Sequence, residues 1–140
     1  MVRRACVVST FDMVNVADLD LLDQVRQASD EMTVVVLADE VATALHGRAP
    51  VVPERERIDL VAALRDLDQV LLCTHLDQLP GEGVTLYSDE ELLADRVDVL
   101  LAPRRRSASG ELRRALAHGH PDTRASGPRT QNQSTAGGAA

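Results

Sequence analysis

The chain has 140 residues, a formal net charge of −7 and an aromatic content of only 1%. This length fits one domain, and its core must be aliphatic, because hydrophobic residues still make up 44% of the chain. The acidic balance argues against binding to nucleic acid or to anionic membranes, since both need a basic surface. All 15 basic residues are arginine, so no candidate site can use a lysine.

Apolar runs alternate with helical patterns along most of the chain. In chain order we expect a strand at 5–10, a helix at 18–29, a strand at 33–38, a short helix at 39–45, a helix at 54–67, strands at 69–74 and 84–87, a short helix at 89–94, a strand at 97–102 and a helix at 109–117. Apolar strands that alternate with helices are typical of a parallel sheet covered on both faces. The sequence therefore predicts an α/β fold with a five-stranded, mainly parallel sheet.

The two ends of the chain differ in character. Residues 1–118 form the predicted domain, whereas 119–140 lack periodicity and predict a disordered low-complexity tail. The N-terminus begins like a signal peptide, but it reaches polar Ser9 too soon for an apolar segment, and no run approaches the ~18 apolar residues of a membrane span. Cys6 and Cys73 lie within apolar runs, which indicates buried, reduced thiols and a cytoplasmic protein.

The loop after the first strand carries the most informative motif. Residues 10–18 read Thr-Phe-Asp-Met-Val-Asn-Val-Ala-Asp. They resemble the Thr-Phe-Asp-x-x-His-x-Gly-His segment of nucleotidyltransferases of the glycerol-3-phosphate cytidylyltransferase type. Asn15, Ala17 and Asp18 stand at the positions of the first histidine, the glycine and the second histidine.

Further segments extend this resemblance over about residues 5 to 74. Residues 38–40 resemble the Ser-Asp-Glu of the family, and residues 48–64 resemble its Arg-Pro-Pro-Val-x-Pro segment with the following Glu-Arg and Ile-Val-x-Ala-Leu. Asp68 falls where the family places an aspartate before its third strand. The resemblance implies a Rossmann-like single domain, in agreement with the alternation of strands and helices, and proteins that are commonly dimers.

Such enzymes move CMP or AMP from CTP or ATP to a small phosphorylated acceptor such as glycerol 3-phosphate, and Mg²⁺ is the cofactor expected of an active member. The resemblance places Asn15 and Asp18 at the catalytic positions. Candidate nucleotide-binding residues, from the family motifs and from the loops after the strands, are Thr10, Phe11, Asp12, His46, Arg57, His75, Arg104, Arg105, Ser107 and Ser109.

The altered motif changes the chemistry of the loop. Asn15 can donate a hydrogen bond but stays neutral, and Ala17 adds a methyl group where the backbone should approach phosphate closely. The carboxylate of Asp18 repels phosphate, by about 1 kcal/mol at ~4 Å in water and about 4 kcal/mol at an effective dielectric constant of 20. We expect Asp18 to serve as the N-cap of the following helix.

Several other candidates have a purely structural alternative. His46 can close its helix, Arg57 can pair with a helix carboxylate, and His75 can face solvent. The basic run at 104–106 can be a solvated loop, and no metal site is expected at 118–120, because its two histidines have no further ligands.

Three functions remain open at this point. The first is a degenerate family member with weak or lost transferase activity, which binds a nucleotide, a phosphometabolite or a partner. The second is an active nucleotidyltransferase with a rearranged site. The third is a structural partner, either a homodimer or a chain paired with an active paralogue. A flavodoxin-like or receiver-like fold is a weaker alternative, because receivers need a lysine after the last strand.

Overall fold

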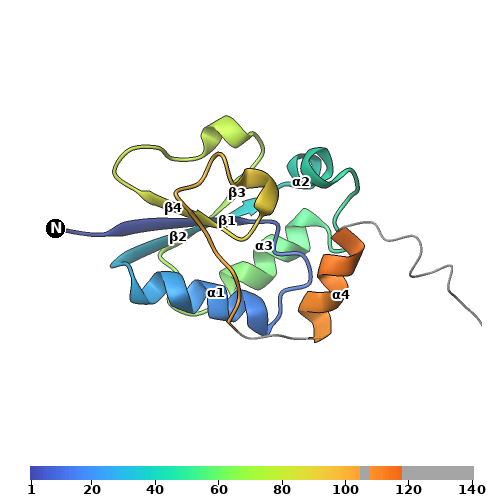
Figure 1. The fold of residues 1–140 in the computed structure, drawn as a ribbon, viewed down its shortest axis with the longest axis horizontal. Coiled ribbons are helices and arrows are strands. Elements are labelled where there is room, and N and C mark those ends of the chain that lie inside the picture. The colour runs from blue at the N-terminus through green and yellow to red at the C-terminus, as the bar shows by residue number, and fades with distance from the viewer. Residues whose placement is uncertain (105–107, 118–140) are drawn as a thin grey trace, which may run out of the picture.

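Strands and helices alternate along the described chain (Figure 1). The computed structural model describes residues 1–104 and 108–117. In order, the elements are β1 (Arg4–Ser9), α1 (Val16–Gln27), β2 (Glu31–Leu37), α2 (Asp39–His46), α3 (Glu54–Ala62), β3 (Gln69–Cys73), the 3₁₀ helix η1 (Leu76–Gln78), β4 (Thr85–Ser88), the 3₁₀ helix η2 (Glu91–Leu93), β5 (Val99–Leu100) and α4 (Ala108–Ala117). The predicted tail lies outside the described residues.

All five strands are parallel and lie in the order β3-β2-β1-β4-β5. The chain builds outward from β1 to β3 and then returns, so that β4 pairs with the other side of β1. Val7 in the centre of β1 lies opposite Val34 of β2 and Tyr87 of β4. The strand order therefore reverses between β1 and β4, and sheets of this kind bind ligands outside the carboxyl ends of the strands at such a reversal. The predicted α/β, Rossmann-like fold is confirmed.

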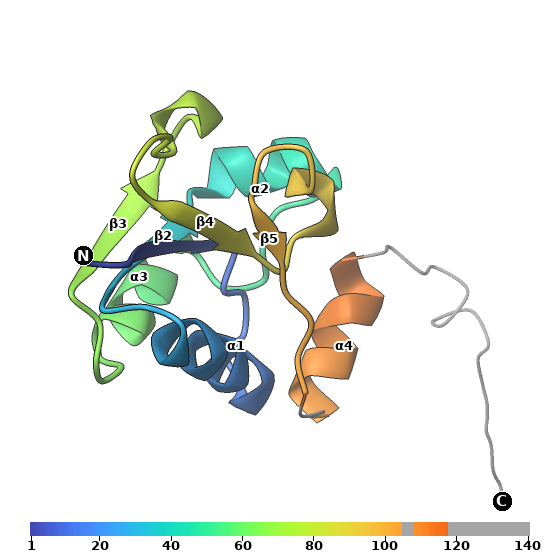
Figure 2. The same ribbon diagram turned by 60° about the vertical axis from the view of Figure 1, so that its left-hand side comes forward.

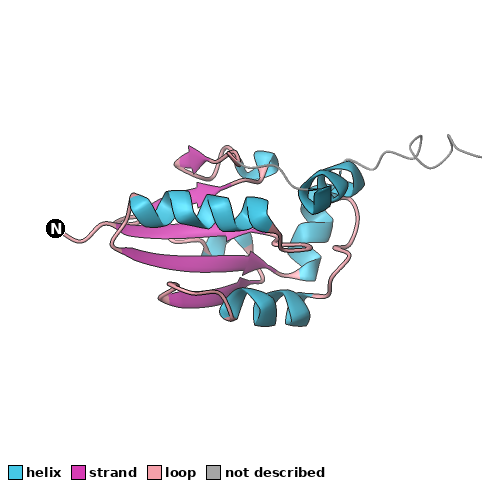
Figure 3. Cartoon of the chain, turned by 90° about the horizontal axis from the view of Figure 1, so that it is seen from below, coloured by secondary structure: helices cyan, strands magenta, loops and turns pink. Residues whose placement is uncertain are grey.

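Helices cover both faces of the sheet. In Figure 1, α1 and α3 lie below the strands and α2 lies above them, and Figure 3 shows from below how helices lie over the strands. The core on the α1 and α3 side is built around Val25, Val34 and Val61, and the core on the other side around Val8 and Leu37. The core is aliphatic, as predicted, with Phe11 as its buried aromatic ring.

Two predicted elements are shorter in the structure. The helix expected at 54–67 ends at Ala62, because the chain turns back toward β3 through Asp66, which has a φ of +67°. Leu64 and Leu67, which extended the helical pattern, pack on the α1 and α3 side of the core from this turn. The strand expected at 97–102 pairs only at Val99–Leu100, since β4 ends at Ser88.

The remaining differences are small. The predicted helix at 89–94 is the single 3₁₀ turn η2, and a second 3₁₀ turn, η1, follows β3. Cys6 and Cys73 are free and buried, as expected. Across residues 1–104 and 108–117, no helix is both long enough and apolar enough to cross a lipid bilayer.

Candidate active site

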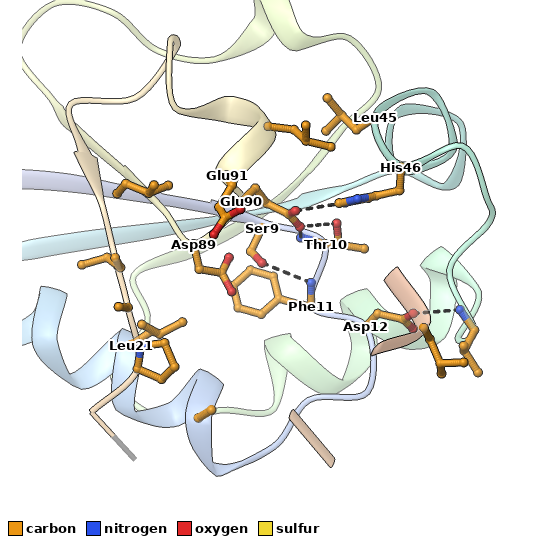
Figure 4. Close-up of a pocket in the computed structure, with 18 of the residues that line it drawn as sticks. Ser9, Thr10, Phe11, Asp12, Leu21, Leu45, His46, Asp89, Glu90 and Glu91 are labelled. Atoms are coloured by element: carbon orange, nitrogen blue, oxygen red, sulfur yellow. Dashed lines mark hydrogen bonds and ion pairs between the residues drawn. The ribbon is translucent and has the colours of Figure 1, made fainter. Parts of the chain in front are cut away.

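A pocket of about 550 Å³ lies at the carboxyl ends of β1, β4 and β5 (Figure 4). Its walls are largely aliphatic and include Leu21, Leu45, Leu101 and Leu116. The titratable side chains that line it are Asp12, His46, Arg48, Asp89, Glu90 and Glu91. The pocket thus occupies the place where the strand order reverses, and carboxylates outnumber cationic groups in its lining.

The loop from β1 to α1 forms one wall and is held in an unusual conformation. Phe11 and Met13 both have a φ of +54°, a region that residues other than glycine rarely adopt. The ring of Phe11 is buried in the core below the loop. The carboxylate of Asp12 accepts hydrogen bonds from the backbone N–H groups of Val51 (2.8 Å) and Val52 (2.9 Å). Strained backbone of this kind persists where surrounding contacts over-determine it, and it clusters at functional sites.

Arg57 fixes the same loop from beneath. Its guanidinium is fully buried and donates to the backbone carbonyls of Thr10 (2.6 Å), Leu37 (2.7 Å) and Val52 (2.8 Å). It also pairs with the Asp39 carboxylate at 2.7 Å. Arg57 thus joins the ends of β1 and β2 to α3 and contacts a helix carboxylate, and it is not among the residues that line the pocket.

The N-terminus of α1 is closed by its own side chains. Asn15 Oδ1 accepts a hydrogen bond from the Ala17 N–H at 2.9 Å, and Asp18 Oδ2 accepts one from the Asn15 N–H at 3.0 Å. Together these contacts form a capping box. The amide of Asn15 donates back to the Met13 carbonyl at 2.9 Å.

The expectation that Asp18 is the N-cap is wrong. Asn15 is the N-cap, because its backbone is extended and the helix begins at Val16. Asp18 is the third residue of the helix, and it is buried with 1% of its surface exposed. Neither Asn15 nor Asp18 lines the pocket, whereas Ala17 between them does.

His46, Glu90 and Thr10 form a hydrogen-bonded chain across the pocket (Figure 4). His46 Nε2 lies 3.0 Å from Glu90 Oε1, and Glu90 Oε2 accepts from the Thr10 hydroxyl (2.5 Å) and the Thr10 N–H (3.1 Å). The hydrogen bond to Glu90 raises the pKa of His46 against the opposing effect of its burial. Burial raises the pKa of Glu90, but the bonds from His46 and Thr10 outweigh it and leave that pKa below its usual value. The chain joins the end of α2 to the ends of β1 and β4.

This ion pair predicts a pH-dependent stability. Because the pKa of His46 is raised in the folded protein, its contribution is complete below the unfolded value of about 6.5 and is lost as the pH rises through the folded pKa. We expect His46→Gln to lower the free energy of unfolding by about 1 kcal/mol near pH 6, and by less near pH 8. Urea unfolding of both proteins over this pH range measures the difference. In a Glu90→Gln background the same change should lose most of its pH dependence, since Asp89 and Asp12 make only smaller contributions to the raised pKa of His46. A pH dependence of undiminished size there would contradict the assignment.

Arg48 lies at the outer rim of the pocket. Its guanidinium donates to the backbone carbonyl of Leu116 in the last turn of α4. A cation at this end of a helix is favoured by the helix dipole. Figure 2 shows α4 beside β5 and α1, and Leu116 lines the pocket. Arg48 and His46 are the cationic groups of the described lining.

Only some of the site residues predicted from the sequence lie at the pocket. Four of them line it together: Thr10, Phe11, Asp12 and His46. Arg104 instead binds Asp20 through its backbone N–H (2.7 Å) and its guanidinium (2.9 Å), and these bonds lower the pKa of Asp20. It therefore fastens the chain after β5 to α1.

The remaining candidates lie elsewhere. His75 is the N-cap of η1 after β3, at the opposite edge of the sheet from β5, and is not part of the pocket lining. Ser109 lies in the first turn of α4. Arg105 and Ser107 lie outside the described residues, as do residues 118–120. Within the described part of the chain, no group of three or more histidine, cysteine and acidic side chains is arranged to hold a metal ion.

Sequence reasoning did not identify Glu90 as the residue that connects the site. The only signal was its place in the loop directly after a predicted strand, at the carboxyl edge of the sheet. Its partner Thr10 is 80 residues away in the sequence, so no local pattern connects the two.

Comparison with known proteins gives the family. A sequence profile described as cytidylyltransferase-like matches residues 6–120. The chain belongs to the cytidylyltransferase-like family. It is 35% identical over 101 residues to the FAD synthase of Methanoregula boonei (strain DSM 21154 / JCM 14090 / 6A8), in a match that covers 65% of this chain and 67% of that protein.

A solved structure supports the same fold. The crystal structure of the lipopolysaccharide core biosynthesis protein from Thermoplasma volcanium GSS1 matches with a TM-score of 0.57 and 20% identity. The match covers 76% of this chain and all of that chain. The chain is therefore a cytidylyltransferase-like protein with the nucleotidyltransferase fold.

Proposed function

We propose that this cytidylyltransferase-like protein has lost nucleotidyl transfer and uses its pocket to bind a nucleoside monophosphate or a phosphometabolite of similar charge. The observation that carries the proposal is the capping box at the N-terminus of α1. In this fold a helix N-terminus offers free N–H groups and a positive dipole end to phosphate. Here Asn15 and Asp18 take up backbone N–H groups of the loop and the first turn of that helix, and Asp18 brings a negative charge.

The charge of the pocket supports the second half of the proposal. Arg48 and His46 provide two cationic groups, against the carboxylates of Asp12, Asp89, Glu90 and Glu91. Two such groups suit one phosphate, whereas a triphosphate would place further charge beside the carboxylates without compensation. The aliphatic walls and the volume of about 550 Å³ fit a nucleoside.

Calorimetric titration tests this proposal. The purified protein should bind AMP or CMP more tightly than ATP or CTP, with and without Mg²⁺. Arg48→Gln should weaken the binding of the monophosphate at least about tenfold, because it removes the cation at the pocket rim. Arg96→Gln is the matched control, since Arg96 is exposed and is not part of the pocket lining. Tighter binding of the triphosphate would overturn the proposal.

Adenylyl transfer is the second candidate, and the similarity to an FAD synthase favours it. In that case His46 and Arg48 would replace the missing donors of the loop, and Mg²⁺ would be bound mainly through the phosphates of the nucleotide. The acceptor would then be a small phosphorylated compound. Transfer of AMP or CMP by the purified protein would support this candidate against the first.

A further inference from the structure

The carboxylate of Glu90 occupies the crevice between the carboxyl ends of β1 and β4. Its Oε2 accepts hydrogen bonds from the Thr10 hydroxyl at 2.5 Å and from the Thr10 N–H at 3.1 Å, and its Oε1 lies 3.0 Å from His46 Nε2 (Figure 4). The side chain of Glu90 is only 12% exposed. Donors from the end of β1 and from the end of α2 therefore converge on one carboxylate inside the pocket.

These donors have the composition of an anion site. A backbone N–H, a hydroxyl and an imidazole that can be protonated bind the oxygens of a phosphate as readily as those of a carboxylate. The site also lies where the strand order reverses, which is where sheets of this kind take their ligands. Glu90 thus stands at the position that an anionic group of a ligand would need.

The backbone of Glu90 is fixed, so that its side chain alone has to move to free the donors. The N–H of Glu90 donates to Ser88 Oγ at 3.0 Å, and that hydroxyl donates to the Val8 carbonyl at 2.5 Å. The carbonyl of Glu90 accepts from the Leu93 N–H at 2.9 Å. None of these bonds uses the carboxylate. Rotation of the side chain about its own bonds would therefore release the donors and leave the loop in place.

We propose that Glu90 is a built-in competitor for the phosphate of the ligand, and that the phosphate binds to Thr10 and His46 by displacing the Glu90 carboxylate. This inference rests on the proposed function for the class of ligand, and it names the residue that sets the affinity. Because the free chain holds Glu90 on these donors, the apparent affinity falls with the fraction of molecules in which they are free. Glu90 thus weakens the binding of phosphorylated compounds and not that of uncharged ones.

The charges around His46 determine the pH at which the displacement is best measured. The hydrogen bond to Glu90 is the largest cause of the raised pKa of His46, and Asp89 and Asp12 raise this pKa further, whereas burial lowers it. At about pH 5.5, below the usual value of His46, the imidazole is protonated with or without the Glu90 carboxylate. Glu90 is still charged there, because its pKa lies below its usual value.

Calorimetric titration at about pH 5.5 tests the displacement, with AMP as the phosphorylated probe and adenosine as its uncharged counterpart. Glu90→Gln should raise the affinity for AMP at least about tenfold and change that for adenosine no more than about twofold, because it removes the competing charge. Glu90→Ala should raise the affinity for AMP at least as much, since its side chain cannot reach the donors.

Glu91→Gln is the matched control for the charge. It removes the same charge from the next residue of the pocket lining, but the bonds from Thr10 and His46 go to Glu90. We expect it to raise the affinity for AMP by less than about threefold. Equal gains for Glu90→Gln and Glu91→Gln would overturn the inference, because they would reflect only the net charge of the pocket.

The outcomes also separate this inference from the proposed function. If the natural chain binds AMP and neither Glu90→Gln nor Glu90→Ala binds it more tightly, the inference is overturned and the proposed function stands. If only the Glu90 variants bind AMP, the inference is supported and the proposed function fails for the natural chain. Binding by none of these proteins would contradict both.

A double variant tests whether the gain arises at these donors. His46→Gln combined with Glu90→Gln should bind AMP less than about threefold more tightly than the natural chain does, because the protonated imidazole is then missing. A tenfold gain that persists without His46 would mean that the phosphate binds elsewhere, and would contradict the displacement.

Discussion

Replacing Arg57 with methionine will lower the free energy of unfolding by about 3–5 kcal/mol, because it leaves backbone carbonyls that the buried guanidinium serves without their donor. The guanidinium is fully buried, and the change deprives three backbone carbonyls and the Asp39 carboxylate of their donor. Methionine fills much of the same volume, so the loss reports the hydrogen bonds rather than a cavity. Urea unfolding at neutral pH measures the effect.

Arg55 provides the control for this experiment. It lies on the same helix, α3, but its side chain is exposed. We expect Arg55→Met to change the stability by no more than about 0.5 kcal/mol. Arg57→Lys should restore only part of the loss, since a lysine retains the charge but cannot reach several carbonyls at once. Equal effects of Arg57→Met and Arg55→Met would show that Arg57 does not hold the loop.

The combined change Asn15→His, Ala17→Gly and Asp18→His will raise the affinity for CTP or ATP at least about 100-fold. It opens the capping box, removes the negative charge at the N-terminus of α1 and supplies two imidazole donors. Removal of one charge at ~4 Å from a phosphate is worth up to about 4 kcal/mol at an effective dielectric constant of 20, so a 100-fold gain is within reach. Calorimetric titration of the variant and the natural chain compares the affinities.

Asp18→Asn separates the charge from the rest of this change. The amide oxygen can still accept the hydrogen bond from the Asn15 N–H, so the box and the fold should be retained. We expect Asp18→Asn to raise the affinity for CTP or ATP by less than the triple change does, because it removes the charge but supplies no imidazole donor. A folded triple variant that binds neither CTP nor ATP more tightly would mean that this loop is not the phosphate site of the fold.

The elements of the fold were predictable because their signals are local. Runs such as Thr-Val-Val-Val-Leu in β2 and the spacing of Leu22 and Val25 in α1 identify buried strands and helix faces without knowledge of the rest of the chain. The end of α3 was not predictable in this way. Leu64 and Leu67 continue the helical pattern, but they reach the core from a turn that the path to β3 requires.

The site was predictable only in part, because topology decides which loops meet. His46 is the last residue of α2 and His75 follows β3, but β3 lies at the far edge of the sheet, so only His46 reaches the pocket. Asp18 was predicted to be the N-cap of α1, but the N-cap is Asn15, three residues earlier, because the backbone of Asn15 is extended. The sequence left two roles for Arg57, nucleotide binding or pairing with a helix carboxylate. Its burial under the β1 loop depends on contacts with Leu37 and Thr10, which are 20 and 47 positions away in the sequence.

The most direct test of the lost transfer activity is a reaction with the natural chain. The purified protein, with Mg²⁺ and α-³²P-labelled CTP or ATP, is incubated with glycerol 3-phosphate and with other small phosphorylated acceptors, and the products are separated by chromatography. We expect no labelled product above a control without protein, although the same preparation binds AMP or CMP. A labelled CMP or AMP adduct whose formation depends on His46 and Arg48 would contradict the account and establish a nucleotidyltransferase with a rearranged site.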